Sequence, residues 1–201
     1  MKPFLLLQSR PETAAADNEY EAFRQFGGLE SHQLQRIAMH QGELGDMNLE
    51  DYSGIILGGG PGNVTDPVHK KSSAELEFEP KLYRLLQEIV DKDFPFLGAC
   101  LGVGLLTNAL GGVVSRRYAE SVGPVTITKT DEGHTDPLLA ELPVSFEAFV
   151  GHKEACEVLP QQAVLLAGSA TCPVQLFRIG RNVYATQFHP ELDAHGLELR
   201  V

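Results

Sequence analysis

The sequence predicts an α/β fold: a mostly parallel central sheet with helices on both faces, and antiparallel strands added in the C-terminal half. In the first half, short apolar runs alternate with helical patterns, an order that favours parallel strands joined by right-handed crossovers. Two glycine-containing turns each follow an apolar run, and such turns gather at the carboxyl ends of the strands of an open sheet. The second half has strand-like runs with little helical pattern between them.

The first half is expected to hold four strands and three helices. Apolar runs of strand length cover residues 4–7, 34–39, 54–57 and 94–98. Helical patterns cover residues 17–26, 74–90 and 100 to about 110. In the first helix, Asp17 or Asn18 is available as the cap and Gly27-Gly28 as the stop.

The second half is expected to extend the sheet within the same domain. Its strand-like runs cover residues 113–114, 122–128, 146–150, 163–167, 174–179 and 183–188. Residues 180–182, between the last two runs, indicate a hairpin connection. A helix is predicted to begin at Asp193, and the end at Val201 leaves it short. Because no linker divides the chain, we expect residues 1–201 to form a single domain.

Composition narrows the classes of function. The chain has 16 basic and 27 acidic residues and a formal net charge of −11, which argues against nucleic acid or an anionic membrane as a partner. The three cysteines form neither a disulfide framework nor a zinc-binding pattern, so no metal is expected, and free thiols suit a reducing cytosol. No apolar run approaches the roughly 20 residues of a membrane span, so we expect a cytoplasmic protein.

Cys100 is the candidate nucleophile. The segment Gly98-Ala99-Cys100-Leu101-Gly102 follows a predicted buried strand and opens a helix, which is the form of a nucleophile elbow with cysteine in place of serine. The start of a helix favours thiolate over thiol, and the N–H of Leu101 is placed to donate to an oxyanion. The alternative is a small buried hydrophobic residue, which is common for free cysteine.

His189 and Glu191 supply the candidate base and its orienting carboxylate. They stand two residues apart at the end of the last predicted strand, where alternate side chains share a side. Pro190 biases His189 toward extended backbone. This gives a nucleophile, a base and an orienter in the order Cys100, His189, Glu191.

The glycine turn, residues 58–62 (Gly58-Gly59-Gly60-Pro61-Gly62), favours an oxyanion contact over nucleotide binding. It lacks the lysine and hydroxyl residue of a phosphate loop, so no nucleotide or other cofactor is expected. A turn of this kind lets backbone N–H groups approach a substrate, and Gly59 or Gly60 is the expected second oxyanion donor.

Three motifs together carry a family resemblance. They are Ile55-Ile56-Leu57 with the glycine turn, Phe96-Leu97 with the elbow, and Gln187-Phe188-His189-Pro190-Glu191. In this order, over about residues 45–192, the chain resembles the class I (triad) glutamine amidotransferases and is similar to the glutaminase domains of GMP synthases. The resemblance implies a flavodoxin-like sheet, a γ-glutamyl thioester on Cys100 and ammonia released to an acceptor.

The resemblance also suggests where substrate binds. It places Gly59, and the strand end Gly151-His152, beside bound glutamine. Members of this family commonly continue the elbow as Cys-Leu-Gly-His-Gln, where the glutamine side chain helps to hold the substrate. Here Val103-Gly104 takes that place. Gly104 costs about 1 kcal/mol in a helix relative to alanine, which indicates that space is needed there.

Three hypotheses follow. The first is a stand-alone glutamine amidotransferase whose ammonia acceptor lies on a separate synthetase subunit. The second is a γ-glutamyl hydrolase or peptidase with the same triad, acting on substituted amides admitted by Val103-Gly104. The third is a binding or regulatory module without catalysis, against which the presence of all three triad residues argues.

Overall fold

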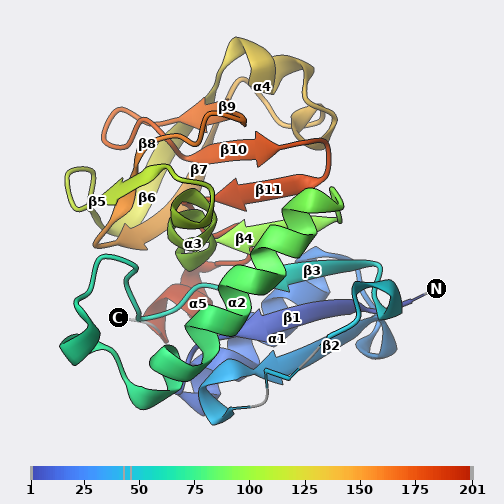
Figure 1. Ribbon diagram of the computed structural model, residues 1–201. Coiled ribbons are helices and arrows are strands. Elements are labelled where there is room, and N and C mark those ends of the chain that lie inside the picture. The colour runs from blue at the N-terminus through green and yellow to red at the C-terminus, as the bar shows by residue number, and fades with distance from the viewer. Residues whose placement is uncertain (1, 43, 46, 200–201) are drawn as a thin grey trace.

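The computed structural model describes residues 2–42, 44–45 and 47–199, and a nine-stranded mixed sheet runs through both halves of it (Figure 1). The strand order is β2-β1-β3-β4-β11-β10-β9-β6-β7. The strands of this sheet are β1 (Phe4–Gln8), β2 (Leu34–Ala38), β3 (Gly54–Leu57), β4 (Phe96–Ala99), β6 (Glu120–Lys129), β7 (Ser145–His152), β9 (Ala163–Gly168), β10 (Leu176–Ile179) and β11 (Val183–Thr186).

The first five strands of that order are parallel neighbours and have the flavodoxin-like arrangement. The last of them, β11, comes from the far end of the sequence and lies beside β4, with Thr186 opposite Ala99. This pairing brings the residues that follow β11 next to the elbow that follows β4. The predicted α/β, mostly parallel core with a flavodoxin-like order is therefore confirmed.

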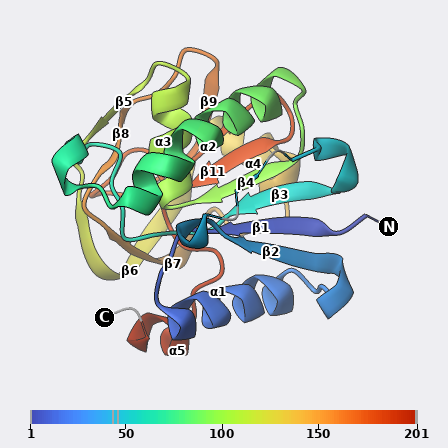
Figure 2. The same ribbon diagram turned by 60° about the horizontal axis from the view of Figure 1, so that its bottom comes forward.

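Helices cover both faces of the parallel strands (Figure 2). The helices α2 (Ser73–Asp91) and α3 (Leu101–Ala109) lie on one face, and α1 (Thr13–Phe26) and α5 (Ala194–Glu198) lie on the other. Alternation along β1 explains this, because Leu5 and Leu7 join the core under α2 and α3 while Leu6 joins the core under α1. Ser72 begins α2 with a capping box to Glu75.

The remaining strands extend the sheet antiparallel, as predicted. β10 pairs antiparallel with both β11 and β9, and β6 pairs antiparallel with β9 and β7. The connection at residues 180–182 is the expected hairpin, with Gly180 at φ 57° and the carboxylate of Asp93 accepting from the backbone N–H groups of Arg181 and Asn182.

Some boundaries differ from the sequence-based expectation. Helix α1 begins at Thr13 and not at residue 17 as predicted. Its N-cap, Glu12, makes no side-chain hydrogen bond, so this start has no capping signal in the sequence. The run at residues 113–114 forms β5 (Val113–Ser115), which pairs outside the main sheet with the unpredicted β8 (Ala155–Val158). The short helix α4 (Asp131–Thr135) was also unpredicted. Helix α5 follows Asp193, the predicted start of a helix, and the side chain of Asp193 caps it.

Among the described residues, none of the helices has both the length and the apolar character that crossing a bilayer requires.

Candidate active site

Cys100 occupies a strained turn between β4 and α3. Its φ of 48° and ψ of −86° are unusual for a residue with a side chain, and such backbone strain is concentrated at functional sites. A Cβ on Gly98 would lie 3.0 Å from the Cα of Gly102, so the turn needs its first glycine. The N–H of Cys100 donates to the carbonyl of Thr186 at 2.7 Å, which fastens the elbow to β11.

His189 is held from two sides. Its N–H donates to the carbonyl of Phe149 on β7 at 2.9 Å, and its Nδ1 lies 2.9 Å from Oε1 of Glu191, which is buried. Burial alone lowers the pKa of the imidazole. The charges of Glu191 and Cys100, and hydrogen bonds to both, outweigh burial and raise the pKa of His189 to about 10.

Gln187 adds a contact that the sequence pattern did not single out. Its Nε2 lies 3.8 Å from Sγ of Cys100, within reach of a hydrogen bond to sulfur. Gln187 is fully buried and stands two residues before His189, so the same strand end carries both contacts to the cysteine.

A cavity of about 250 Å³ opens beside these residues and is lined by both Cys100 and His189. Five other predicted site residues line it: Gly60, Leu101, Gly104, Gly151 and His152. Gly59 lies against the imidazole instead, since a Cβ there would come within 2.6 Å of Cε1 of His189. The structure corrects the expectation for Val103, because helix α3 directs its side chain away from the cavity into the core against the sheet.

The backbone supplies donors beside the sulfur. Within the described part of the chain, the N–H groups of Gly59, Gly60 and Leu101 have no hydrogen-bond acceptor. Gly60 and Leu101 both line the cavity that Cys100 lines. A Cβ on Gly60 would collide with Oγ of Ser9, so a side chain cannot be accommodated at this point of the glycine turn. Two unspent donors near a nucleophile have the chemistry of an oxyanion hole.

Comparisons with known proteins identify the family of this chain. The sequence matches the family model described as Glutamine amidotransferase class-I over residues 18–197. The chain belongs to the class I glutamine amidotransferase family. It is 31% identical over 150 residues to a glutamine-hydrolyzing GMP synthase of Borrelia garinii, a match that covers 75% of this chain and 25% of that protein.

Two further relatives span more of their own length. One is a subunit of the glutamine-hydrolyzing GMP synthase of Thermoplasma acidophilum, 27% identical over 176 residues, with 83% of this chain and 81% of that protein covered. A crystal structure of a glutamine amidotransferase from Thermotoga maritima superposes with a TM-score of 0.77 at 24% identity, covering 98% of this chain and 80% of the other. The amidotransferase chain spans about a quarter of the GMP synthase of Borrelia garinii.

The space at Gly104 is filled by other residues of the chain. A Cβ at Gly104 would lie 3.1 Å from Oε1 of Glu154 and 3.1 Å from Cγ2 of Val64. The carboxylate of Glu154 accepts from the N–H of Val64 at 2.6 Å and from the N–H and Oγ1 of Thr65 at 2.9 and 2.7 Å. The glycine therefore admits a carboxylate that ties the loop after the glycine turn to the strand end at Gly151-His152.

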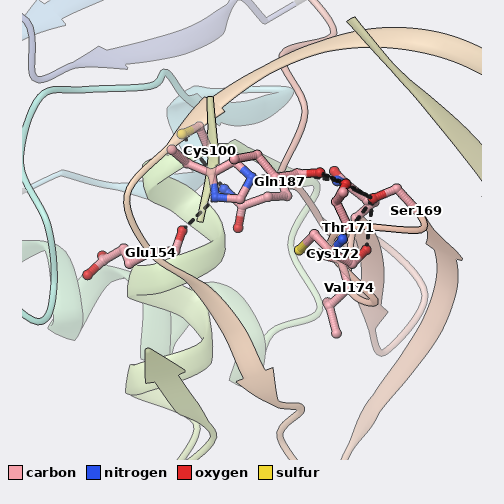
Figure 3. A network of polar contacts seen from close by, with 10 residues as sticks. Cys100, Glu154, Ser169, Thr171, Cys172, Val174 and Gln187 are labelled. Atoms are coloured by element: carbon pink, nitrogen blue, oxygen red, sulfur yellow. Dashed lines mark hydrogen bonds and ion pairs between the residues drawn. The ribbon is translucent and has the colours of Figure 1, made fainter. Parts of the chain in front are cut away.

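A network of polar contacts that includes Glu154, Ser169 and Cys172 is shown in Figure 3. His152 belongs to this network. Its Nδ1 lies 2.9 Å from the carbonyl oxygen of Glu154, and its Nε2 lies 2.7 Å from Oε2 of Glu120. A carbonyl only accepts, so Nδ1 carries a proton, and another proton must lie between Nε2 and the carboxylate. Both ring nitrogens are committed, so His152 shapes the cavity by holding the strand end.

Glu120, His152 and Cys172, here called the buried cluster, are the residues most able to hold a metal in the described part of the chain, with ligand atoms within 4.8 Å of one another. These atoms are already engaged. Besides His152, Glu120 accepts from Gln175, Ser169 and Thr171. The thiol of Cys172 donates to the carbonyl of Val174, and burial raises the pKa of this thiol to about 12. Each of the three side chains of the buried cluster is therefore held by hydrogen bonds to other residues of the chain.

Arg10 is a second residue that sequence reasoning missed. It stands two residues after the end of β1 and lines the cavity together with Cys100. Its Nε lies 3.4 Å from Oε1 of Glu19, which is completely buried. The signal was present in the sequence, because Arg10 stands at the carboxyl end of a parallel strand, the edge at which the glycine turn and the elbow were found.

Proposed function

We propose that this chain is a glutaminase of the amidotransferase type, which hydrolyses the side-chain amide of glutamine through a γ-glutamyl thioester on Cys100. His189 acts as acid and base, and Glu191 orients it. The observation that carries the proposal is that Cys100 and His189 line one cavity, while the hydrogen bond from the N–H of Cys100 to Thr186 holds the elbow against the strand that precedes His189.

The first half of the reaction forms the thioester. The Cys100 thiolate attacks the amide carbon, and the carbonyl π electrons move to oxygen, where the N–H groups of Leu101 and Gly59 or Gly60 donate to the negative charge. The imidazolium of His189 gives its proton to the amide nitrogen. The C–N bond breaks and ammonia leaves. The raised pKa of His189, about 10, favours the thiolate–imidazolium pair as the resting form.

The second half releases glutamate. Water enters beside His189, which takes a proton from it as the oxygen attacks the thioester carbon. The tetrahedral intermediate collapses, the C–S bond breaks, and Cys100 returns as a thiolate. Glu191 stays ionised throughout and fixes the imidazole tautomer, as the acid of a Ser-His-Asp triad does.

Ammonia and glutamate release from L-glutamine tests the proposal, with Cys100→Ala as the inactive comparison. A second measurement is labelling of the protein by an electrophilic glutamine analogue, followed by peptide mass spectrometry. We expect turnover that is lost in Cys100→Ala and a label confined to Cys100. Absence of both turnover and labelling would exclude the enzymatic function and favour a binding module.

The ammonia acceptor is proposed to lie on a separate synthetase subunit. The Thermoplasma acidophilum relative supports this, because its name describes one subunit of a GMP synthase. The chain aligns with about a quarter of the Borrelia garinii enzyme, which leaves the rest of that protein unmatched. Addition of a synthetase encoded beside the chain is expected to raise glutaminase turnover. Unchanged turnover and no complex by size-exclusion chromatography would argue against this partner.

The second candidate function is hydrolysis of substituted γ-glutamyl amides. It is favoured by Gly104, which stands where members of the family commonly have a glutamine residue whose side chain helps to hold the substrate. Because Glu154 and Val64 fill that space, the pocket differs in shape and charge from one lined by glutamine. A panel of γ-glutamyl amides assayed beside L-glutamine separates the two candidates, since faster cleavage of the substituted amides would favour the hydrolase.

A further inference from the structure

Arg10 has hydrogen-bond donors that none of the described residues uses. A guanidinium carries five N–H donors, and the contacts among described residues use only Nε, toward Glu19. The side chain is 13% exposed, and Arg10 is one of the residues that line the catalytic cavity.

The position of the guanidinium is fixed by groups behind it. Glu19 is fully buried, and Gln8 donates to its other oxygen at 3.0 Å. Pro11 restrains the backbone of Arg10 to extended conformations. A cation held in this way is ready to bind an anion with little loss of side-chain entropy.

Arg10 also lies beside the catalytic histidine. A Cβ on Gly59 would be 3.2 Å from Nη2 of Arg10 and 2.6 Å from Cε1 of His189, so the two side chains meet over this glycine. An anion bound by Arg10 would therefore stand next to the group that protonates the leaving nitrogen.

We propose that Arg10 is a specificity-determining residue that binds a carboxylate of the substrate inside the catalytic cavity. The inference rests on the proposed function, since it names a second group on the same amide substrate. Arginine forms two parallel hydrogen bonds to a carboxylate, which selects for that group over a neutral one.

Two carboxylates have this chemistry. One is the α-carboxylate of the glutamyl unit, and the other is a carboxylate on the leaving amine, as in a γ-glutamyl amino acid. Lys153 also lines the cavity, but its side chain is exposed. Within the described residues, no hydrogen bond or ion pair holds its ammonium group in one position, in contrast to the guanidinium of Arg10. Glu154, an anion that also lines the cavity, has its oxygens turned to Val64 and Thr65.

The experiment measures equilibrium binding by calorimetry to the Cys100→Ala protein. One pair of ligands is L-glutamine and its α-amide. The other pair is γ-L-glutamylglycine and γ-L-glutamylglycinamide. We expect the carboxylate to be preferred roughly 10- to 100-fold in one pair, the usual range for a charged hydrogen-bonded pair, and the pair that discriminates identifies the source.

The same titrations are repeated after Arg10→Gln and Arg10→Lys. The preference is expected to fall to within about threefold in Arg10→Gln and to be partly kept in Arg10→Lys, which retains charge but not the fork. The control is Arg178→Gln, because Arg178 also pairs with a buried carboxylate, Asp136 at 2.8 Å, but does not line the cavity. Its ligand preference is expected to match that of Cys100→Ala alone.

A preference that survives in Arg10→Gln, or one that is lost in Lys153→Gln instead, would overturn the inference. So would equal or absent binding of both members of each pair. Preferential binding without turnover in the wild type would refute the proposed function alone, and turnover with no dependence on Arg10 would refute only this inference.

Discussion

Two regions of this molecule contain the same three residue types and differ in chemistry. The candidate triad joins Cys100 with His189 and Glu191, and the buried cluster joins Cys172 with His152 and Glu120. A search by residue type alone would rank them equally. Their surroundings separate them.

The two thiols differ in backbone and solvent access. Cys100 sits at a strained φ of 48° at the start of α3 and lines a cavity. Cys172 is fully buried, donates to a carbonyl, and has a pKa raised to about 12 by burial. A neutral buried thiol is a poor nucleophile.

The two histidines differ in what their second nitrogen meets. The imidazole of His189 has Glu191 on one side and the thiol of Cys100 as its other partner. His152 spends both nitrogens on Glu120 and on the carbonyl of Glu154, with none left to serve a sulfur. A base therefore requires one anchored nitrogen and one facing the nucleophile, which composition cannot reveal.

The largest predicted effect separates the two cysteines. Cys100→Ala is expected to lower kcat for amide hydrolysis at least about 10⁴-fold, because no other group forms the thioester. Cys172→Ala is expected to stay within about threefold of wild type, since its thiol is only packed and hydrogen-bonded. Steady-state ammonia release measures both, and comparable losses would remove the distinction between the regions.

The next largest effect is expected at Glu191, the carboxylate of the candidate triad. Glu191→Gln is expected to lower kcat roughly 10³-fold while the protein keeps its fold, because the imidazole loses its orienting charge. Gln retains the shape of the side chain, so KM should change little. An unchanged kcat in a folded Glu191→Gln protein would contradict the assigned role.

Gly59→Ala tests how closely the glycine turn fits the base. The added methyl would come within 2.6 Å of Cε1 of His189, so the ring must move. A displacement of this order is expected to cost about 10²-fold in kcat. The matched control is Gly123→Ala, because nothing lies within 4 Å of a Cβ at that glycine. Equal activity of the two variants would show that the ring does not depend on Gly59.

The parallel half and its elbow were predictable because local signals mark them. Two of the apolar runs there, residues 54–57 and 94–98, lead into glycine-containing turns, and the triad residues lie in two short motifs at strand ends. Strand β8 was not predictable, since Ala155–Val158 has no pattern of its own and forms by pairing with β5. The start of α1 at Thr13 was missed because its cap makes no side-chain bond.

Several site residues act through contacts that no local pattern encodes. Glu154 reaches Val64, 90 positions away in the sequence, and only the folded chain brings them together. Gln187 lies in the same motif as His189 and Glu191. The contact of its amide with the sulfur of Cys100 arises only because β11 pairs with β4, the strand before the elbow. Val103 was misplaced because a helix turns successive side chains by about 100°. Gly104 therefore lines the cavity while Val103, one residue before it, faces the core.

Glu120→Ala tests the buried cluster as a structural element. It would leave His152, Gln175 and the hydroxyl donors without their shared acceptor, and we expect the free energy of unfolding to fall by about 3 kcal/mol. Glu157→Ala is the control, since Glu157 pairs with Arg117 at the surface and its loss should cost much less than the loss of Glu120. Urea unfolding measures both, and equal costs would argue against a structural role for the cluster.

A pH series observes both regions at once. The pKa of His189 is raised from 6.5 to about 10, so its proton stabilises the fold fully below about pH 6.5, and this contribution is lost as pH rises through about 10. Cys172 is an acid whose pKa rises from 9.0 to about 12, so its contribution is complete below about pH 9 and is lost between about 9 and 12. Both groups make the free energy of unfolding fall as pH rises, but His189 acts between about pH 6.5 and 10 and Cys172 between about pH 9 and 12.

Urea midpoints measured from pH 7 to 11 should therefore resolve the two groups. His189→Gln is expected to flatten the decline that begins near pH 7, whereas Cys172→Ala should flatten only the part above about pH 9. Neither group can contribute more than about 1.4 kcal/mol per pH unit. A wild-type decline that begins only above pH 9 would mean that His189 holds no extra proton in the folded state, and that the thiolate–imidazolium pair is not the resting form of the triad.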